Sequence, residues 1–284
     1  MLGFMATYSL EDVRAVRKER DAWWTVLLVD PIAVRLAWVI ANRTPFTPDQ
    51  ITLSAFALGL GAAGCFAQAS PGWLAVGALL YHLGFVLDCV DGKIARLRGT
   101  GSPFGAWLDF MLDRVRDGLC ALALAGGQYA ATGQIAYLWL GFAILALDMI
   151  RYLNGPQIAK ARRRMAEGLR ESGREPLDAR PEPEPARYRR VRRRLLRCRI
   201  RMHLVSGIEF QMATFIVGPL TGAIIPVTAA AGLLLLAFEF LIVYRFWVSS
   251  RAYTRAVAER HTAAPPTAPP HAVALSAPSR AGDQ

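Results

Sequence analysis

Two pairs of aspartates between residues 88 and 113 are the strongest candidates for chemistry in this sequence. Asp88 and Asp91 form one pair, and Asp109 and Asp113 form the other. On helices, a spacing of three or four residues places both members of a pair on one face. Two helices that meet at the intervening turn would gather four carboxylates, which repel one another and require cations. Ligand sets made only of oxygen favour Mg²⁺ or Mn²⁺ over zinc, so we predict a divalent metal site.

The composition indicates the membrane class of proteins. The chain has 284 residues, of which 54% are hydrophobic, and a net charge of +11. An ordinary soluble domain of this length would be less apolar. The four cysteines are scattered, which argues against a disulfide framework and a zinc site. The first twenty residues lack the long apolar core of a secretory signal peptide.

Hydrophobic segments predict an all-α integral membrane protein with six transmembrane helices, each able to reach across about 30 Å of hydrocarbon. These segments lie near residues 51–69, 72–90, 104–126, 132–153, 205–226 and 228–248. The first half of the third carries five charged side chains, so we expect it to line a wet cavity walled by protein. Residues 28–43 form an amphipathic stretch too short and too charged to span, and we predict an interfacial helix there.

The distribution of basic residues predicts the orientation and the division of the chain. The connections at 68–72, 127–134 and 220–227 contain no Lys or Arg. Both termini and the acid cluster should therefore lie on the cytoplasmic side of the cell membrane. We divide the chain into an N-terminal cytoplasmic segment with the juxtamembrane helix, a six-helix catalytic domain that includes a basic loop, and a disordered cytoplasmic tail. Their ranges are 1–50, 51–250 with the loop at 154–204, and 251–284.

The basic loop favours a membrane surface over nucleic acid. Residues 160–201 hold 16 of the 33 Lys and Arg residues against six acids. The stretch 187–201 could form a basic helix on anionic lipid headgroups, with a solvated disordered loop as the alternative. Nucleic acid is disfavoured because aromatic residues are nearly absent. Residues 181–185 read as a stiff proline-rich spacer.

The aspartates belong to a longer pattern that resembles the signature of the CDP-alcohol phosphotransferase family at every fixed position. In this sequence the pattern reads Asp88-x2-Asp91-Gly92-x2-Ala95-Arg96-x8-Gly105-x3-Asp109-x3-Asp113. The resemblance covers roughly residues 20–250. It implies cleavage of the pyrophosphate in a CDP-linked donor, transfer of the phosphoryl-alcohol part to a second alcohol, and release of CMP. It also implies two Mg²⁺ or Mn²⁺ ions and a homodimer.

The resemblance assigns a role to each matched position. Asp88, Asp91 and Asp109 would be the core metal ligands, and Asp113 the general base, which could also touch a metal. The nucleotide and donor positions would be Gly92, Ala95, Arg96 and Gly105, the small ones because they allow close approach to the backbone. These roles agree with phosphoryl transfer, which depends on positioning and charge neutralisation.

The substrates are less sharply indicated than the reaction. Residues 113–117 and the approach at 21–48 resemble the branch of the family that makes inositol-phosphate conjugates, with Asp49 as a departure. We expect CDP-diacylglycerol as donor and a polyol or inositol phosphate as acceptor, in phospholipid biosynthesis. The soluble pair CDP-inositol and inositol phosphate is the alternative. Candidates for holding an acceptor phosphate are Arg151, Arg245 and Lys93.

Structural ion pairs compete with some of these roles. We favour an ion pair between Asp117 and Arg114, three residues apart, over a role of Asp117 at the site. Arg151 could equally pair with an acid in a span, and the same holds for Arg245. The acids available to them are Asp148, Glu209 and Glu239.

Two other classes of protein remain open. An intramembrane prenyltransferase also uses two aspartate pairs and Mg²⁺, but it has more spans and pairs far apart in the chain. A non-catalytic cation-binding membrane protein would leave the small residues and the arginine of the signature without a purpose. Release of CMP distinguishes the transferase from both.

Overall fold

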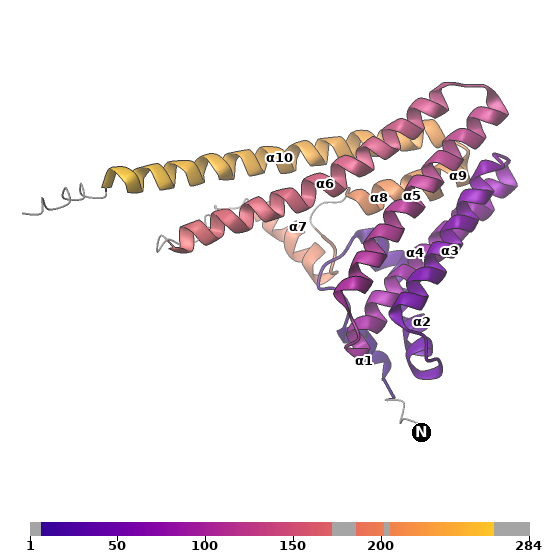
Figure 1. The fold of residues 1–284 in the computed structure, drawn as a ribbon, viewed down its shortest axis with the longest axis horizontal. Helices are drawn as coiled ribbons and strands as arrows, with labels where there is room; N and C mark the ends of the chain where they lie inside the picture. Colours follow the sequence, from indigo (N-terminus) through magenta and orange to yellow (C-terminus); the bar gives the residue numbers. More distant parts are fainter. Residues whose placement is uncertain (1–6, 172–185, 202–204, 264–284) are drawn as a thin grey trace, which may run out of the picture.

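The computed structural model describes residues 7–171, 186–201 and 205–263, and its regular elements there are all helices (Figure 1). In chain order they are α1 (Leu10–Ala15), η1 (Thr25–Val29), α2 (Asp30–Arg43), α3 (Pro48–Ala67), α4 (Pro71–Arg98), α5 (Pro103–Thr132), α6 (Ala136–Glu171), α7 (Ala186–Arg197), α8 (Gly207–Met212), η3 (Ala213–Val217), α9 (Gly218–Thr221) and α10 (Ile224–Ala263). The labels η1 and η3 mark one turn of π-helix each.

Local sequence signals set the ends of the helices around the acid cluster. Proline occupies the first turn of α3, α4 and α5, where its missing N–H is tolerated. Thr47 and Ser102 accept hydrogen bonds from the first turns of α3 and α5. Helix α4 ends at Gly99, whose φ of 64° is the left-handed conformation that glycine adopts easily. The turn between α4 and α5 is therefore short, and it brings Asp109 of α5 close to Asp88 and Asp91 of α4.

The protein is a multi-pass membrane protein, with five stretches long and apolar enough to cross a membrane in the part of the chain that the structure describes. They are Thr25–Arg43, Pro48–Ala67, Pro71–Arg98, Ala136–Arg170 and Ile224–Arg255. The last four overlap predicted spans, and the first overlaps the predicted interfacial helix. Helix α5 has 30 residues, but its charges keep it out of this set, and residues 207–221 are divided among three short elements. The all-α fold is confirmed, whereas the six spans and the interfacial position stay predictions.

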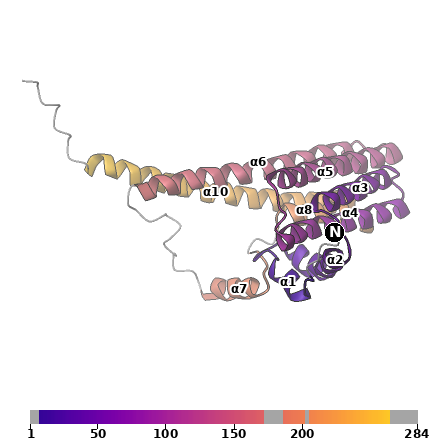
Figure 2. The same ribbon diagram turned by 60° about the horizontal axis from the view of Figure 1, so that its bottom comes forward.

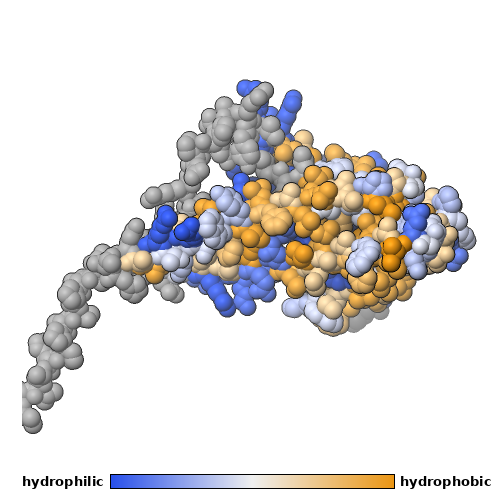
Figure 3. Space-filling view, turned by 90° about the horizontal axis from the view of Figure 1, so that it is seen from above, coloured by the Kyte–Doolittle hydropathy of each residue, from blue (hydrophilic) through white to orange (hydrophobic). Residues whose placement is uncertain are grey.

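The acid cluster lies at one end of the bundle. The turns that join α3 to α4 and α5 to α6 gather at the opposite end, together with α9 (Figure 1). The turn between α4 and α5 lies at the same end as α1 (Figures 1 and 2). In Figure 3 the flank of the bundle is broadly hydrophobic, as a lipid-facing surface requires.

Helices α6 and α10 continue beyond the bundle as a parallel pair (Figure 1), in which Arg151 contacts Glu239 and Gly168 faces Tyr253 further along. Residues 154–171, expected to begin the basic loop, are helical, and so are residues 251–263, expected to begin the tail. Packing explains the extension: Leu169 is 4% exposed, and a Cβ on Gly168 would lie 2.7 Å from the Tyr253 hydroxyl of α10. Residues 172–185, with the predicted spacer, and 264–284, the rest of the predicted tail, lie outside the described part. Most of the stretch 187–201, for which a basic helix was predicted, belongs to helix α7, which ends at Arg197.

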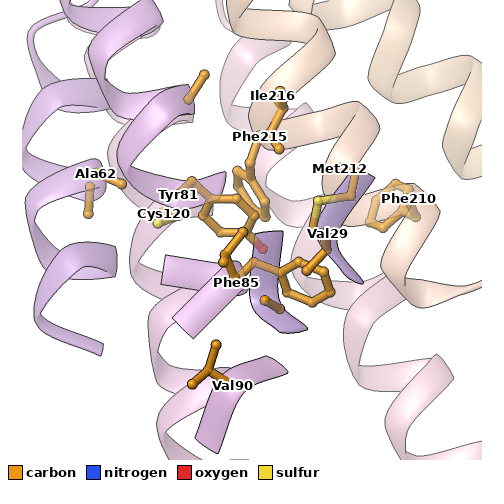
Figure 4. Packing of buried hydrophobic residues seen from close by; sticks show 14 of the residues in the cluster. Val29, Ala62, Tyr81, Phe85, Val90, Cys120, Phe210, Met212, Phe215 and Ile216 are labelled. Carbon is orange, nitrogen blue, oxygen red and sulfur yellow. The ribbon is translucent and has the colours of Figure 1, made fainter. Parts of the chain in front are cut away.

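Aromatic packing joins the segment after α7 to the helices around the acid cluster. Tyr81 of α4 is fully buried, and its ring centroid lies 4.8 Å from that of Phe215 in η3. Phe66 of α3 also stacks on Phe215, with their ring centroids 6.2 Å apart. Figure 4 shows Tyr81 and Phe215 at the centre of this cluster, with Phe85, Cys120 and Met212 nearby. The core thus fixes η3 against α3 and α4.

Candidate active site

Three of the four signature aspartates converge where α4 meets α5. Asp88, Asp91 and Asp109 each offer a carboxylate oxygen, and these oxygens all lie within 4.8 Å of one another. Asp91 is 5% exposed, and the other two are partly buried. Carboxylates this close repel one another unless a cation joins them. The arrangement could hold one metal ion.

Two details show that the acid triad (Asp88, Asp91, Asp109) fits a hard cation. The Oδ1 atom of Asp109 is buried without a hydrogen-bond partner, so one acceptor is available. The hydroxyl of Thr52 on α3 donates to Oδ2 of Asp91 at 2.5 Å, and this hydrogen bond orients the carboxylate. A donor set made only of carboxylate oxygens is the type that Mg²⁺ and Mn²⁺ prefer.

Asp113, the fourth signature aspartate, lies outside this triad. Its Oδ1 is 2.8 Å from Nη1 of Arg116, one turn further along α5. Its side chain is 24% exposed, whereas that of Arg116 is only 3% exposed. The structure therefore separates the four acids into three that face one another and one that pairs with an arginine.

A cavity of about 270 Å³ opens on one side of the triad, and we call it the glycine-side cavity. It contains every signature position assigned to the donor. Its lining consists of Pro48, Asp49, Thr52, Asp91, Gly92, Ala95, Arg96, Thr100, Gly101, Ser102, Gly105, Ala106 and Asp109. The absence of a side chain at Gly105 matters, because a Cβ there would lie 2.8 Å from Oδ1 of Asp49. The small residues keep open a space where a ligand can approach the backbone.

A second cavity, of about 140 Å³, lies on the other side of the triad, and we call it the cation-side cavity. Four cationic residues line it together with the acids. The lining consists of Lys18, Asp21, Asp30, Asp88, Cys89, Asp91, Gly92, Lys93, Arg96, Asp109 and Arg199. Because Asp91, Gly92, Arg96 and Asp109 border both cavities, the triad stands between them. This arrangement suits the meeting of two different ligands at one metal site.

Segments far apart in the chain close the cation-side cavity. Asp30 of α2 lies 2.9 Å from the Lys93 ammonium and 3.1 Å from the Arg199 guanidinium. Arg199 follows α7 and has a φ of 61°, a conformation that is strained for a residue with a side chain. Backbone hydrogen bonds hold it there, since Asp21 donates to the Arg199 carbonyl and accepts from the N–H of Arg201.

The remaining predicted residues have other neighbours. Arg151, a candidate for an acceptor phosphate, lies 2.9 Å from Glu239, which also accepts from the amide of Asn154. Arg245 is exposed on α10, six residues beyond Glu239. Lys93 is buried in the wall of the cation-side cavity. Arg96 donates from Nε to the Val16 carbonyl at 2.7 Å, so it also holds the N-terminal segment against α4.

A network of ion pairs lies beneath the site. Asp117 pairs with Arg114 at 2.9 Å, which confirms the predicted ion pair. Arg114 also contacts Asp148 of α6 at 2.7 Å. Sequence reasoning missed Thr52, Arg116, Lys18 and Arg199. Thr52, Lys18 and Arg199 reach the site through packing against another segment, whereas Arg116 lies one turn beyond Asp113 on the same helix.

Comparison with known proteins places a family domain over the site. Residues 46–166 match the family model described as CDP-alcohol phosphatidyltransferase. A bifunctional IPC transferase and DIPP synthase of Aquifex aeolicus is 42% identical over 39% of this chain and 24% of its own length. An archaetidylinositol phosphate synthase of Methanothermobacter thermautotrophicus is 33% identical over 37% of this chain and 54% of its own length. A phosphatidylinositol phosphate synthase of Mycobacteroides abscessus is 34% identical over 46% and 56%. The chain thus spans about half the length, or less, of these relatives.

Proposed function

We propose that this chain, which carries a CDP-alcohol phosphatidyltransferase domain at residues 46–166, transfers a phosphoryl-alcohol group from a CDP-linked donor to an alcohol and releases CMP. The observation that carries the proposal is the acid triad standing between two cavities of different character. One cavity is lined by small residues and the other by cations. Such a site can hold a nucleotide and a second substrate on opposite faces of one metal centre.

The donor occupies the glycine-side cavity. Gly92, Ala95 and Gly105 leave the backbone accessible to the cytidine and its pyrophosphate, and Arg96 borders both cavities, where donor phosphates would pass. Asp88, Asp91 and Asp109 would hold the divalent metal. When bound, the metal neutralises charge on the transferred phosphoryl group and the leaving CMP.

Asp113 acts as the general base. The acceptor oxygen forms a bond to the phosphorus that carries the donor alcohol, and the bond from that phosphorus to the bridging pyrophosphate oxygen breaks. The hydroxyl proton goes to a carboxylate oxygen of Asp113, and CMP leaves with the bridging oxygen. The pairing of Asp113 with Arg116 outside the triad supports this role, because a base must keep an oxygen available for the proton.

The acceptor is an inositol phosphate, and the donor is CDP-diacylglycerol. Two relatives are an archaetidylinositol phosphate synthase and a phosphatidylinositol phosphate synthase, whose names refer to inositol phosphate lipids. The cation-side cavity offers Lys18, Lys93 and Arg199 beside the triad, which suits an alcohol that brings its own phosphate. Arg151 lines neither cavity beside the triad, whereas Lys93 lines the cation-side cavity, so we place the acceptor phosphate nearer to Lys93. The soluble pair CDP-inositol and inositol phosphate is the alternative outcome of the test.

The site opens toward the cytoplasm. The proposal rests on the charge distribution, because the basic segments lie at the end of the bundle that carries the acids. The homodimer implied by the family resemblance stays a prediction.

The test is release of CMP by the purified protein in detergent with Mg²⁺ or Mn²⁺. CDP-diacylglycerol should support turnover with inositol 1-phosphate and not with inositol, glycerol 3-phosphate or serine. Asp113→Asn should abolish turnover while the protein still binds Mn²⁺ and the donor. Turnover only with CDP-inositol would establish the soluble pair instead. No CMP from either donor, together with no cytidine binding, would refute the transferase.

A further inference from the structure

Arg116 is the most deeply buried arginine near the site, and neither the family signature nor the proposed chemistry uses it. Its side chain is 3% exposed, although it lies on α5 among apolar helices. Nη1 lies 2.8 Å from Asp113, and Nη2 lies 3.1 Å from Oδ1 of Asp117. One guanidinium therefore joins the proposed base to a second acid deeper in the bundle. A buried cation placed in this way needs an explanation.

The backbone of α3 is shaped to admit this side chain. A Cβ added to Gly59 would collide with Cγ and Cδ of Arg116. The aliphatic stem of the arginine thus runs directly over the α3 backbone at Gly59. On the other side, the ring of Tyr81 lies 5.3 Å from the guanidinium carbon. The stem and the head are both confined, so the guanidinium has little freedom to leave Asp113.

The deeper acid is itself fixed from three helices. Oδ1 of Asp117 accepts from the Tyr81 hydroxyl of α4 at 2.8 Å. Oδ2 accepts from the Gln211 amide of α8 at 2.7 Å and lies 2.9 Å from Arg114. Asp117 is 3% exposed. Asp117 is therefore held in one position. Because Arg116 pairs with Asp117, the guanidinium is held in place as well, and this orients Asp113.

We propose that Arg116 is a positioning residue that orients Asp113 and keeps it out of the metal-binding triad. This inference rests on the proposed role of Asp113 as the base. With its Oδ1 paired to Arg116, Asp113 stays apart from the three carboxylates that lie within 4.8 Å of one another. If that pairing were lost, the carboxylate could turn toward the metal as a fourth ligand. Gly59 is then required because it makes room for the arginine.

Turnover tests the orientation with matched variants on α3. Gly59→Ala should lower kcat at least tenfold, with KM for the CDP-linked donor changed less than about twofold, because the donor cavity is untouched. Gly64→Ala is the control, since a Cβ there meets nothing within 4 Å. Arg116→Lys should retain more turnover than Arg116→Gln. An unchanged kcat in a folded Gly59→Ala protein, or a loss of thermal stability with kcat intact, would overturn the proposal.

Binding of Mn²⁺ tests the inference without turnover. In Arg116→Gln, the released Asp113 should join the metal ligands, so that Mn²⁺ followed by electron paramagnetic resonance binds several-fold more tightly. The gain should vanish in Arg116→Gln/Asp113→Asn. A gain that persists in the double variant would reflect only the loss of a nearby positive charge and would overturn the proposal, as would no gain. A wild-type protein without transfer activity would refute the proposed function, while this measurement would still decide whether Arg116 holds Asp113 out of the triad.

Discussion

The hydroxyl of Thr52 should control metal affinity without touching the metal. Its Oγ1 lies 2.5 Å from Oδ2 of Asp91, and both residues are buried, at 6% and 5% exposure. Thr52→Val keeps the shape of the side chain and removes the donor. A hydrogen bond to a charged group contributes about 1.5–3 kcal/mol. Because about 1.4 kcal/mol is a factor of ten, the loss corresponds to roughly 10–100-fold in an equilibrium constant.

We therefore expect Thr52→Val to weaken Mn²⁺ binding roughly 10–100-fold, the range typical when a residue that orients a metal ligand is removed. Isothermal titration or electron paramagnetic resonance of the purified protein measures this affinity. Thr52→Ser retains the hydroxyl and should bind Mn²⁺ within a few-fold of the wild-type protein. The reasoning fails if the valine variant binds as tightly as the wild type, or if the serine variant loses as much as the valine variant.

Three further outcomes follow from the structure. Lys93→Met leaves Asp30 buried with only Arg199 beside it and should destabilise the protein by about 3 kcal/mol, the low end for breaking a buried pair. Thermal unfolding in detergent measures this loss of stability. The double variant Lys93→Met/Asp30→Asn should regain part of it. Gly127→Ala should lower the unfolding temperature, because its Cβ would lie 2.7 Å from backbone carbonyls of α3, whereas Gly126→Ala, with nothing within 4 Å, should not. Removal of divalent ions with a chelator should stop CMP release, and excess Mg²⁺ or Mn²⁺ should restore it; activity that survives exhaustive chelation would count against the metal site.

Local periodicity explains why so much of the site could be anticipated. The spacing of three between Asp88 and Asp91 puts both on one face of α4. The Gly99 end of α4 and the Ser102 start of α5 are signals within a few residues of the turn. The gathering of Asp109 with the first pair follows from these local rules.

The walls of the site depend on contacts that no local rule encodes. Lys18 precedes the domain and Arg199 follows it by more than thirty residues, yet both border the cation-side cavity. Their approach requires a backbone pairing between Asp21 and Ile200, which is fixed only in the folded chain. The burial of Arg116 likewise depends on a residue distant in the sequence, because its side chain lies against Gly59 of α3.

Helix α6 continues to Glu171, beyond residue 154, where the basic loop was predicted to begin. Pro156 lies inside a helix of 36 residues. A proline normally breaks a helix by removing one hydrogen bond and crowding the preceding turn. Beyond it Leu169 is buried and Gly168 packs against Tyr253 of α10, and that long-range packing outweighs the local cost.

The extended pair of α6 and α10 has a practical consequence for imaging this molecule. Helix α10 has 40 residues, and at 1.5 Å per residue it is about 60 Å long. That is about twice the thickness of the hydrocarbon layer of a bilayer. A small membrane protein usually shows little outside its detergent micelle, so particle images are hard to align. The paired helix ends supply an asymmetric landmark, to which a fusion partner could be joined as a continuation of α10.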